Sequence, residues 1–173
     1  MQVGVPTETF PGERRVALVP AALPKLIKAG IEVLIEPGAG LPSGHRDADY
    51  ADKGAKIAAS RDDLFANADV ILQVRSFGSN LEAGRADLAR LREGQPVIGF
   101  FDPLTEPAAI EEFARTGAAA LSMEMMPRIT RAQSLDILSS MATIAGYKAV
   151  LLAADALRLL FPMMMTAAGT LAA

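Results

Sequence analysis

The densest group of side chains that could do chemistry lies in the segment PRITRAQSLDILSS, residues 127–140. Arg128 offers a two-pronged donor, and Gln133 offers an amide that both donates and accepts. Asp136 adds a carboxylate and Ser139 a hydroxyl group. This combination suits a ribose diol and a carboxamide, which need paired donors and acceptors. No nucleophile with an adjacent base accompanies these residues, so the segment does not suit hydrolysis.

The same segment also has the composition of a helix start. Ser134 is a suitable N-cap, and Asp136 is favourable near the positive end of a helix dipole. Capping alone does not account for Arg128, Arg131 and Gln133 together. Both interpretations of this segment, contact with a nucleotide and capping of a helix, therefore remain open.

Three further polar residues come after expected strands. Arg15 follows a proline-bounded loop after the first expected strand, where it could clamp a carboxylate or phosphate or simply pair with Glu8 or Glu13. Arg75 ends an apolar strand, at the sheet edge where ligands bind in parallel sheets, and a solvated arginine is the more common outcome. Asp102 could serve as a base, although the Asp102–Pro103 pair favours a turn.

A glycine-rich loop contains Gly38, Gly40 and Gly44, but its spacing does not fit a dinucleotide fingerprint. Pro42 also stiffens the loop where backbone N–H groups would have to face a phosphate. His45, the single histidine of the chain, lies in the same loop without a second nitrogen or thiolate ligand. We expect a plain turn here and no metal site.

Composition excludes several classes of protein. The chain has no cysteine, which excludes disulfides, thiolate metal sites and cysteine nucleophiles. Its formal charge is −3 without a lysine or arginine cluster, so nucleic-acid binding is a poor fit. The first 15 residues do not resemble a signal peptide, and the apolar run at 149–154 is too short to span a bilayer. We expect a soluble chain.

Short β-type runs alternate with helix-type runs over most of the sequence. We expect a parallel sheet covered by helices on both faces, a Rossmann-like or flavodoxin-like α/β lobe over residues 1–134. Ser60 with Asp63 predicts one helix start, and Thr105 predicts another. The expected strands are 2–5, 31–35, 56–58, 69–74, 96–101 and 118–123, and the expected helices are 20–29, 47–53, 61–67, 86–92 and 106–115.

The pattern changes after Met123. A polar loop leads into a long helical stretch over about residues 135–160, which suits a link between two domains. Pro162 ends this stretch, and we expect no further element over residues 163–173. We therefore expect a truncated two-domain protein.

The segment MEMMPRITRAQSLDILSS at 123–140 resembles the signature loop of the NAD-binding component (alpha, domain I) of proton-translocating NAD(P) transhydrogenases. The resemblance continues through AGYKAV at 145–150 and FPMMMTAAGT at 161–170. Near the start, residues 3–6, Glu8 and residues 14–20 resemble a pattern that transhydrogenases share with alanine dehydrogenases. The resemblance covers essentially the whole chain, and its most specific part is the long loop.

This resemblance implies that NAD(H) binds between two domains. Residues 135–173 would then comprise the linking helix and the truncated start of the NAD-binding Rossmann domain. The resemblance implies a catalytic role in positioning for Arg128, Gln133 and Asp136 at the nicotinamide end. The cofactor-binding residues that it implies are Arg128, Ile129, Thr130, Gln133, Asp136 and Ser139.

The resemblance also implies partners. A second component would hold NADP(H), and hydride would pass directly between the two nicotinamide rings, with Re/Si specificity and without an acid or base. A membrane component would couple this transfer to proton translocation. We further expect a homodimer on the cytoplasmic or matrix side, peripheral to the inner membrane, and an inactive chain when this piece is isolated.

Two alternatives differ in kind. An alanine dehydrogenase would carry a histidine where Asp102 follows its strand and a substrate-binding lysine in place of Arg75, whereas Arg15 would be retained. A non-catalytic α/β binding domain would lack the glycine fingerprint, as this chain does, but would have no need of the loop at 123–140.

Overall fold

The computed structural model describes residues 1–158 and 161–171. The chain divides into two compact units, Met1–Met126 and Pro127–Ala173. The first, called the sheet unit below, contains the parallel sheet and its helices. The second, called the helical unit, contains one long helix and a short hairpin.

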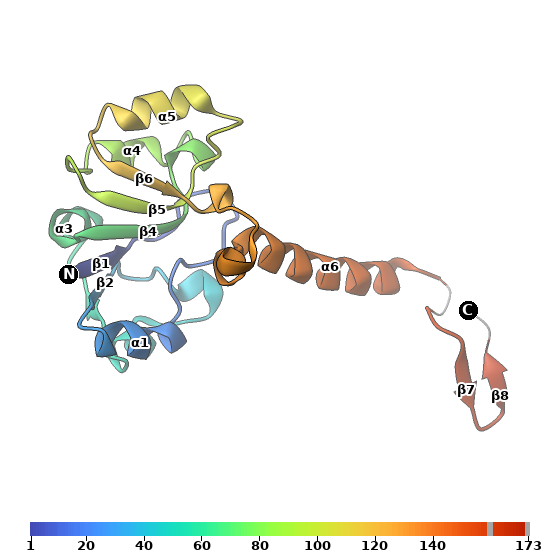
Figure 1. Ribbon diagram of the computed structural model, residues 1–173. Coiled ribbons are helices and arrows are strands. Elements are labelled where there is room, and N and C mark those ends of the chain that lie inside the picture. Colours follow the sequence, from blue (N-terminus) through green and yellow to red (C-terminus); the bar gives the residue numbers. More distant parts are fainter. Residues whose placement is uncertain (159–160, 172–173) are drawn as a thin grey trace. The chain divides into compact units, whose positions relative to one another are not determined.

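The sheet unit is built on six parallel strands in the order β3-β2-β1-β4-β5-β6 (Figure 1). β1 pairs with β2 on one side and with β4 on the other, so the strand order reverses between β1 and β4. Such a reversal is the topological switch point at which open α/β sheets bind ligands. The expected parallel α/β fold is confirmed. The strands are β1 (Gln2–Val5), β2 (Glu32–Ile35), β3 (Lys56–Ile57), β4 (Val70–Arg75), β5 (Pro96–Phe100) and β6 (Ala119–Ser122).

Helices cover both faces of this sheet, and two separate hydrophobic clusters show which helices share a face. Figure 1 shows α4 and α5 near the β6 end of the sheet and α1 near its β2 end. α1 and α2 pack in one cluster, whereas α3 and α5 pack in the other. The helices are α1 (Leu23–Lys28), α2 (Asp47–Ala51), α3 (Arg61–Asn67), α4 (Arg85–Leu88) and α5 (Pro107–Ala114).

Side chains of β2 alternate between the two faces of the sheet, so this strand contributes residues to both clusters. Val33 and Ile35 pack with Leu23 and Tyr50 on one face, whereas Leu34 points to the other face. All three side chains are buried. Successive residues of a strand face opposite sides of a sheet, so a continuous apolar run is what a doubly covered strand requires. Full burial of such a side chain contributes about 1.5–3 kcal/mol.

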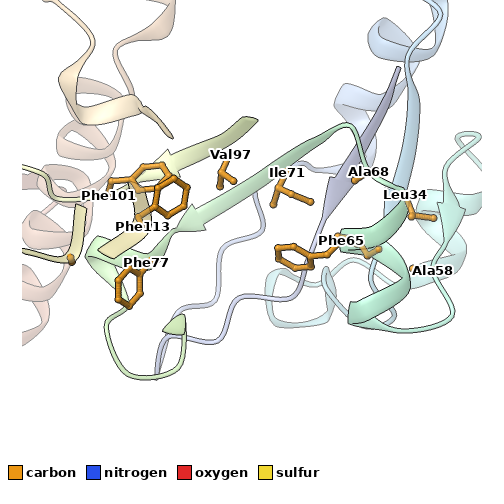
Figure 2. Close-up of a cluster of buried hydrophobic side chains, with 11 residues drawn as sticks. Leu34, Ala58, Phe65, Ala68, Ile71, Phe77, Val97, Phe101 and Phe113 are labelled. Atoms are coloured by element: carbon orange, nitrogen blue, oxygen red, sulfur yellow. The ribbon is translucent and has the colours of Figure 1, made fainter. Parts of the chain in front are cut away.

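The second cluster reaches the carboxyl end of β5. There the rings of Phe101 and Phe113 meet edge to face with centroids 5.1 Å apart (Figure 2). Phe77, which begins the 3-10 helix η3 (Phe77–Ser79), belongs to the same cluster. A Cβ atom on Gly78 would lie 1.6 Å from the carbonyl oxygen of Phe101. Only glycine therefore allows η3 to approach β5 this closely.

Of the two helix starts predicted from N-cap residues, one is confirmed and the other is wrong. Ser60 caps α3, with its Oγ accepting from the backbone N–H of Asp63 at 3.1 Å. Thr105, by contrast, does not cap α5, which begins at Pro107 with Glu106 as an N-cap that makes no side-chain bond. The proline sets the start of this helix because its fixed φ suits the first turn and needs no N–H partner.

The helical unit contains α6 (Ile137–Ala156) and an antiparallel hairpin of β7 (Met164–Thr166) and β8 (Gly169–Leu171). The expectation of no element over 163–173 was therefore wrong for the described residues of that range. Gly169, at φ +133°, permits the turn, and the Thr166 hydroxyl bonds the Gly169 carbonyl at 3.1 Å. Three successive methionines gave no alternation that could have indicated the hairpin.

Helix α6 is mostly apolar and has no distinct polar face, although Lys148 and Asp155 lie within it. Its length and composition meet the conditions for crossing a membrane, and none of the qualifying stretch is buried within the described residues. The apolar run at 149–154 forms only part of this stretch, because Gly146, Tyr147 and Lys148 also lie within the helix. One such helix is weak evidence for a span, since the core helix of a soluble protein meets both conditions.

Candidate functional site

At the carboxyl edge of the sheet, glutamate side chains accept hydrogen bonds from backbone N–H groups that have no partner on a neighbouring strand. Glu8, three residues beyond β1, accepts from the N–H groups of Val74 and Arg75 at 2.6 and 3.0 Å. Its carboxylate continues the β1–β4 ladder beyond the last backbone pair. Burial raises the pKa of the Glu8 carboxyl, although these two backbone bonds oppose that rise.

Two other strand exits are closed in the same manner. Glu36 follows β2 directly and accepts from the N–H of Thr7, just beyond β1, at 2.7 Å. Glu124 follows β6 and accepts from the N–H groups of Phe101 and Asp102 at 2.7 and 2.5 Å. Each glutamate thus caps the exit of the neighbouring strand. The local signal of this role in the sequence is an acidic residue one to three positions after a strand.

A fourth carboxylate, Glu13, binds the two arginines at this edge. Arg15 donates to Glu13 through Nε at 2.8 Å and through Nη2 at 2.6 Å. Arg75 donates through Nε at 3.1 Å and lies over the ring of Phe10, 4.2 Å from its centroid. The simpler interpretation of Arg15, as the partner of a loop glutamate, is therefore confirmed.

This pairing changes the acidity of the Glu13 carboxyl. The side-chain hydrogen bond from Arg15 is the main cause that lowers the pKa of Glu13 from 4.5 to about 2. In the unfolded chain the carboxyl regains its ordinary pKa, so its pairing stabilises the fold above pH 4.5. That contribution is lost as the pH falls towards 2.

We expect the free energy of unfolding to drop by on the order of 2 kcal/mol between pH 4.5 and 2 because of Glu13, with allowance for partly exposed arginines. Glu13→Gln should lose this dependence and be less stable at pH 7. Urea titrations across the range measure both effects. Glu32→Gln, at a glutamate in an exposed pair with Lys56, is the matched control and should change little. Equal pH profiles for Glu13→Gln and the unmodified protein would contradict the pairing.

A cleft of about 570 Å³ opens beside these groups at the carboxyl ends of β4 and β5. Asn80, which lines the cleft and is buried, donates to the hydroxyl of Thr9 at 2.8 Å. Asp102 also lines it and has φ +49°, in the left-handed region. The Asp102 carbonyl accepts from the N–H of Glu106 at 2.8 Å, so the turn interpretation of Asp102 is confirmed. The cleft is lined by Phe10, Pro11, Gly78, Ser79, Asn80, Leu81, Glu82, Asp102, Thr105 and Glu106.

The glycine-rich loop is explained by packing and turns. The N–H of Gly38 donates to a carboxylate oxygen of Asp47 at 2.9 Å. A Cβ atom on Gly40 would lie 2.6 Å from the ring of Tyr50. His45 packs edge to face against the same tyrosine, with centroids 6.3 Å apart. Packing against Tyr50 thus accounts for this glycine and for the place of the histidine.

In the helical unit, three of the predicted site residues come together at the start of α6. Asp136 caps the helix, accepting from the backbone N–H of Ser139 at 2.9 Å and from its hydroxyl at 2.6 Å. Arg128 Nε lies 4.0 Å from Asp136 Oδ2. The Ser139 hydroxyl is the first cause that lowers the pKa of Asp136. Asp136, and not Ser134, is therefore the capping residue.

The remaining predicted residues of the loop face outward. Thr130 begins the 3-10 helix η5 (Thr130–Leu135), which also contains Gln133. Thr130, Gln133 and Ile129 are exposed, and Ile129 has 55% of its surface accessible. Among the described residues, no side-chain hydrogen bond holds Gln133. The loop thus combines a fixed carboxylate with a free amide and a largely exposed guanidinium.

The sequence model of the alanine dehydrogenase/PNT N-terminal domain matches residues 4–145 of this chain. The chain belongs to this family. The NAD(P) transhydrogenase subunit alpha of Cereibacter sphaeroides is 42% identical over 169 residues, which are 98% of this chain and 31% of that protein. The alanine dehydrogenase of Mycobacterium tuberculosis is 35% identical over 146 residues, 84% of this chain and 37% of that protein.

Comparison with a solved structure supports the same family assignment. The crystal structure of transhydrogenase from Sinorhizobium meliloti superimposes with a TM-score of 0.87 at 42% identity, covering 99% of this chain and 49% of that one. The chain therefore spans about a third to a half of the length of these transhydrogenases. The predicted resemblance to transhydrogenase alpha subunits is confirmed.

Proposed function

We propose that this chain is the nicotinamide-facing part of the NAD-binding component of an NAD(P) transhydrogenase, which transfers hydride between NADH and NADP+. The observation that carries the proposal is the loop at the start of α6. There, Arg128, Asp136 and Ser139 come together beside the exposed amide of Gln133. Similarity to transhydrogenase subunits over 98% of the chain supports it further.

The loop has the donor set that a nicotinamide nucleoside requires. Arg128, whose side chain is 68% exposed, can donate to a ribose hydroxyl or carboxamide oxygen. The Gln133 amide can both donate to and accept from a carboxamide. Ile129 offers an exposed apolar surface for a ring. These residues fit NAD(H), which supplies the hydride when it is bound.

Within this proposal, the chain's own residues act by positioning. Asp136 is held by two bonds from Ser139, so its carboxylate presents a fixed acceptor near Arg128. A direct transfer between two rings needs alignment and no proton acceptor, and alignment alone can supply a large part of the rate. NADP(H) would be held by a partner component, and a membrane component would couple transfer to proton translocation. We also propose a homodimer at the cytoplasmic or matrix face of the inner membrane.

The geometry disfavours the amino-acid dehydrogenase alternative. The two arginines that could clamp a substrate carboxylate, Arg15 and Arg75, are both occupied by Glu13. No histidine stands at the end of β5, where Asp102 forms a turn. A transhydrogenase needs neither group.

The complete protein, mixed with its NADP-binding component, should reduce an NADP+ analogue with NADH and should not reduce NAD+ with L-alanine. Both reactions can be followed by absorbance in the same preparation. Alanine oxidation without NADH-to-NADP+ transfer would reject the proposal in favour of the dehydrogenase.

The 173-residue chain by itself is expected to bind NADH only feebly and to transfer no hydride. Its glycine-rich loop is occupied by turns and packing, so adenosine and pyrophosphate contacts would have to come from a second domain. Isothermal calorimetry tests this directly. An affinity in the micromolar range for the isolated chain would show that the main contacts lie in this part after all.

A further inference from the structure

Glu124 connects the sheet to the start of the loop proposed to face nicotinamide. It lies in the 3-10 helix η4 (Met123–Met125), immediately after β6 and four residues before Arg128. Its Oε1 atom accepts from the N–H groups of Phe101 and Asp102. Two bonds to one oxygen thus fix the exit of β6 against the exit of β5 just before the loop begins.

The turn that Glu124 holds is strained. Asp102 is the only non-glycine residue with a positive φ in the described part of the chain, at +49°. Such a conformation costs about 1–3 kcal/mol and persists where the surroundings over-determine it. The paired N–H groups of this turn point at one carboxylate, so Glu124 is one of the groups that hold it.

Glu124 differs from the other two edge glutamates. Glu8 uses both oxygens, and Glu36 adds an ion pair with Arg61 at 2.7 Å. The Oε2 atom of Glu124 is buried without a partner within the described residues, and so is the hydroxyl of neighbouring Ser122. Leaving a buried acceptor unpaired is unfavourable, so stability alone is a poor reason for a carboxylate here.

We infer that Glu124 is a positioning residue for the nicotinamide loop. It acts through Arg128 and the residues that follow, without touching nucleotide, by fixing the point at which the chain leaves β6. The inference rests on the proposed function, because it assigns the loop a geometry that matters for hydride transfer.

The first test compares Glu124→Ala with Glu124→Gln in the complete protein and its NADP-binding component. At saturating NADH, Glu124→Ala should slow single-turnover hydride transfer by about 10–100-fold, while NADH affinity changes by less than about threefold. Glu124→Gln keeps an acceptor oxygen at the same reach and should retain most of the rate. An unchanged rate in Glu124→Ala, or equal losses in both variants, would overturn the inference. Glu124→Asp, one methylene shorter, takes the place of Glu124→Ala if that variant does not fold.

A second variant separates loop positioning from simple support of the turn. Asp102→Gly accepts a positive φ without strain, so adding it to Glu124→Ala should restore part of the lost stability. If Glu124 positions the loop, the slow hydride transfer should remain in this double variant. Recovery of the rate together with the stability would reduce Glu124 to a support for the Asp102 turn.

Hydrogen exchange tests the same inference without any hydride assay. Deuterium uptake of residues 127–136 should rise severalfold in Glu124→Ala and stay unchanged in Glu124→Gln. Unchanged uptake in Glu124→Ala would overturn the inference. Absence of hydride transfer in the unmodified protein would instead count against the proposed function, and the exchange result would still decide the role of Glu124.

Discussion

Replacing Arg61 with methionine is expected to lower the free energy of unfolding by about 3–5 kcal/mol. The Arg61 guanidinium binds Asp87 through two nitrogens at 2.6 and 2.7 Å and Glu36 through a third at 2.7 Å. The three side chains are only 15%, 9% and 16% exposed. Without the cation, Glu36 would lose its ion pair, and Asp87 would be left with the longer pair to Arg90 at 3.6 Å.

Urea unfolding of the Arg61→Met variant measures this loss. Arg115→Met is the matched control, since its pair with Glu111 is exposed and should contribute less than about 1 kcal/mol. Adding Asp87→Asn to Arg61→Met should recover part of the stability by removing one of the stranded charges. A loss no larger than that of Arg115→Met would show that the cluster is not needed for the fold.

The sheet unit was largely predictable because its signals are local. Apolar runs bounded by glycines located the strands, and the capping pair Ser60 and Asp63 located α3. Alternation of strands and helices then required a parallel sheet with both faces covered. The hairpin of β7 and β8 was missed because the methionine run before it has no period-2 pattern.

Contacts between distant residues were not predictable from the sequence. Arg61 meets Glu36 and Asp87 across 25 and 26 positions, and Glu8 meets Val74 across 66. Nothing in the local composition identifies such partners. Spacing was equally uninformative for the loop, where Ser134 was the expected N-cap and Asp136 is the observed one.

The second large effect is expected at Gln133 and Asp136 of the complete protein. If these residues align the nicotinamide end, Gln133→Asn should slow hydride transfer by on the order of a hundredfold, because a misplacement of about 1 Å can cost that much. Asp136→Asn should slow it as well, because it removes the negative charge that lies near Arg128. NADH affinity should stay nearly unchanged, since adenosine and pyrophosphate contacts are expected from the second domain.

In this structure, neither substitution should disturb the fold. The Gln133 side chain is exposed and forms no hydrogen bond with the described residues, so shortening it by one methylene should not disturb the fold. Asparagine at 136 can still cap α6, so this change removes charge while it keeps the helix start. Ser134→Ala, in the same exposed 3-10 helix, is the matched control and should retain the full transfer rate.

The most direct test is single-turnover hydride transfer by Gln133→Asn in complex with the NADP-binding component, with NADH titrated in parallel. The proposed function predicts transfer slowed by on the order of a hundredfold at saturating NADH, with a dissociation constant within about threefold of the unmodified protein. An unchanged transfer rate in Gln133→Asn and in Asp136→Asn would reduce the loop to a helix cap. Weaker NADH binding with unchanged transfer at saturation would contradict the account equally, since the loop would then supply affinity and not alignment.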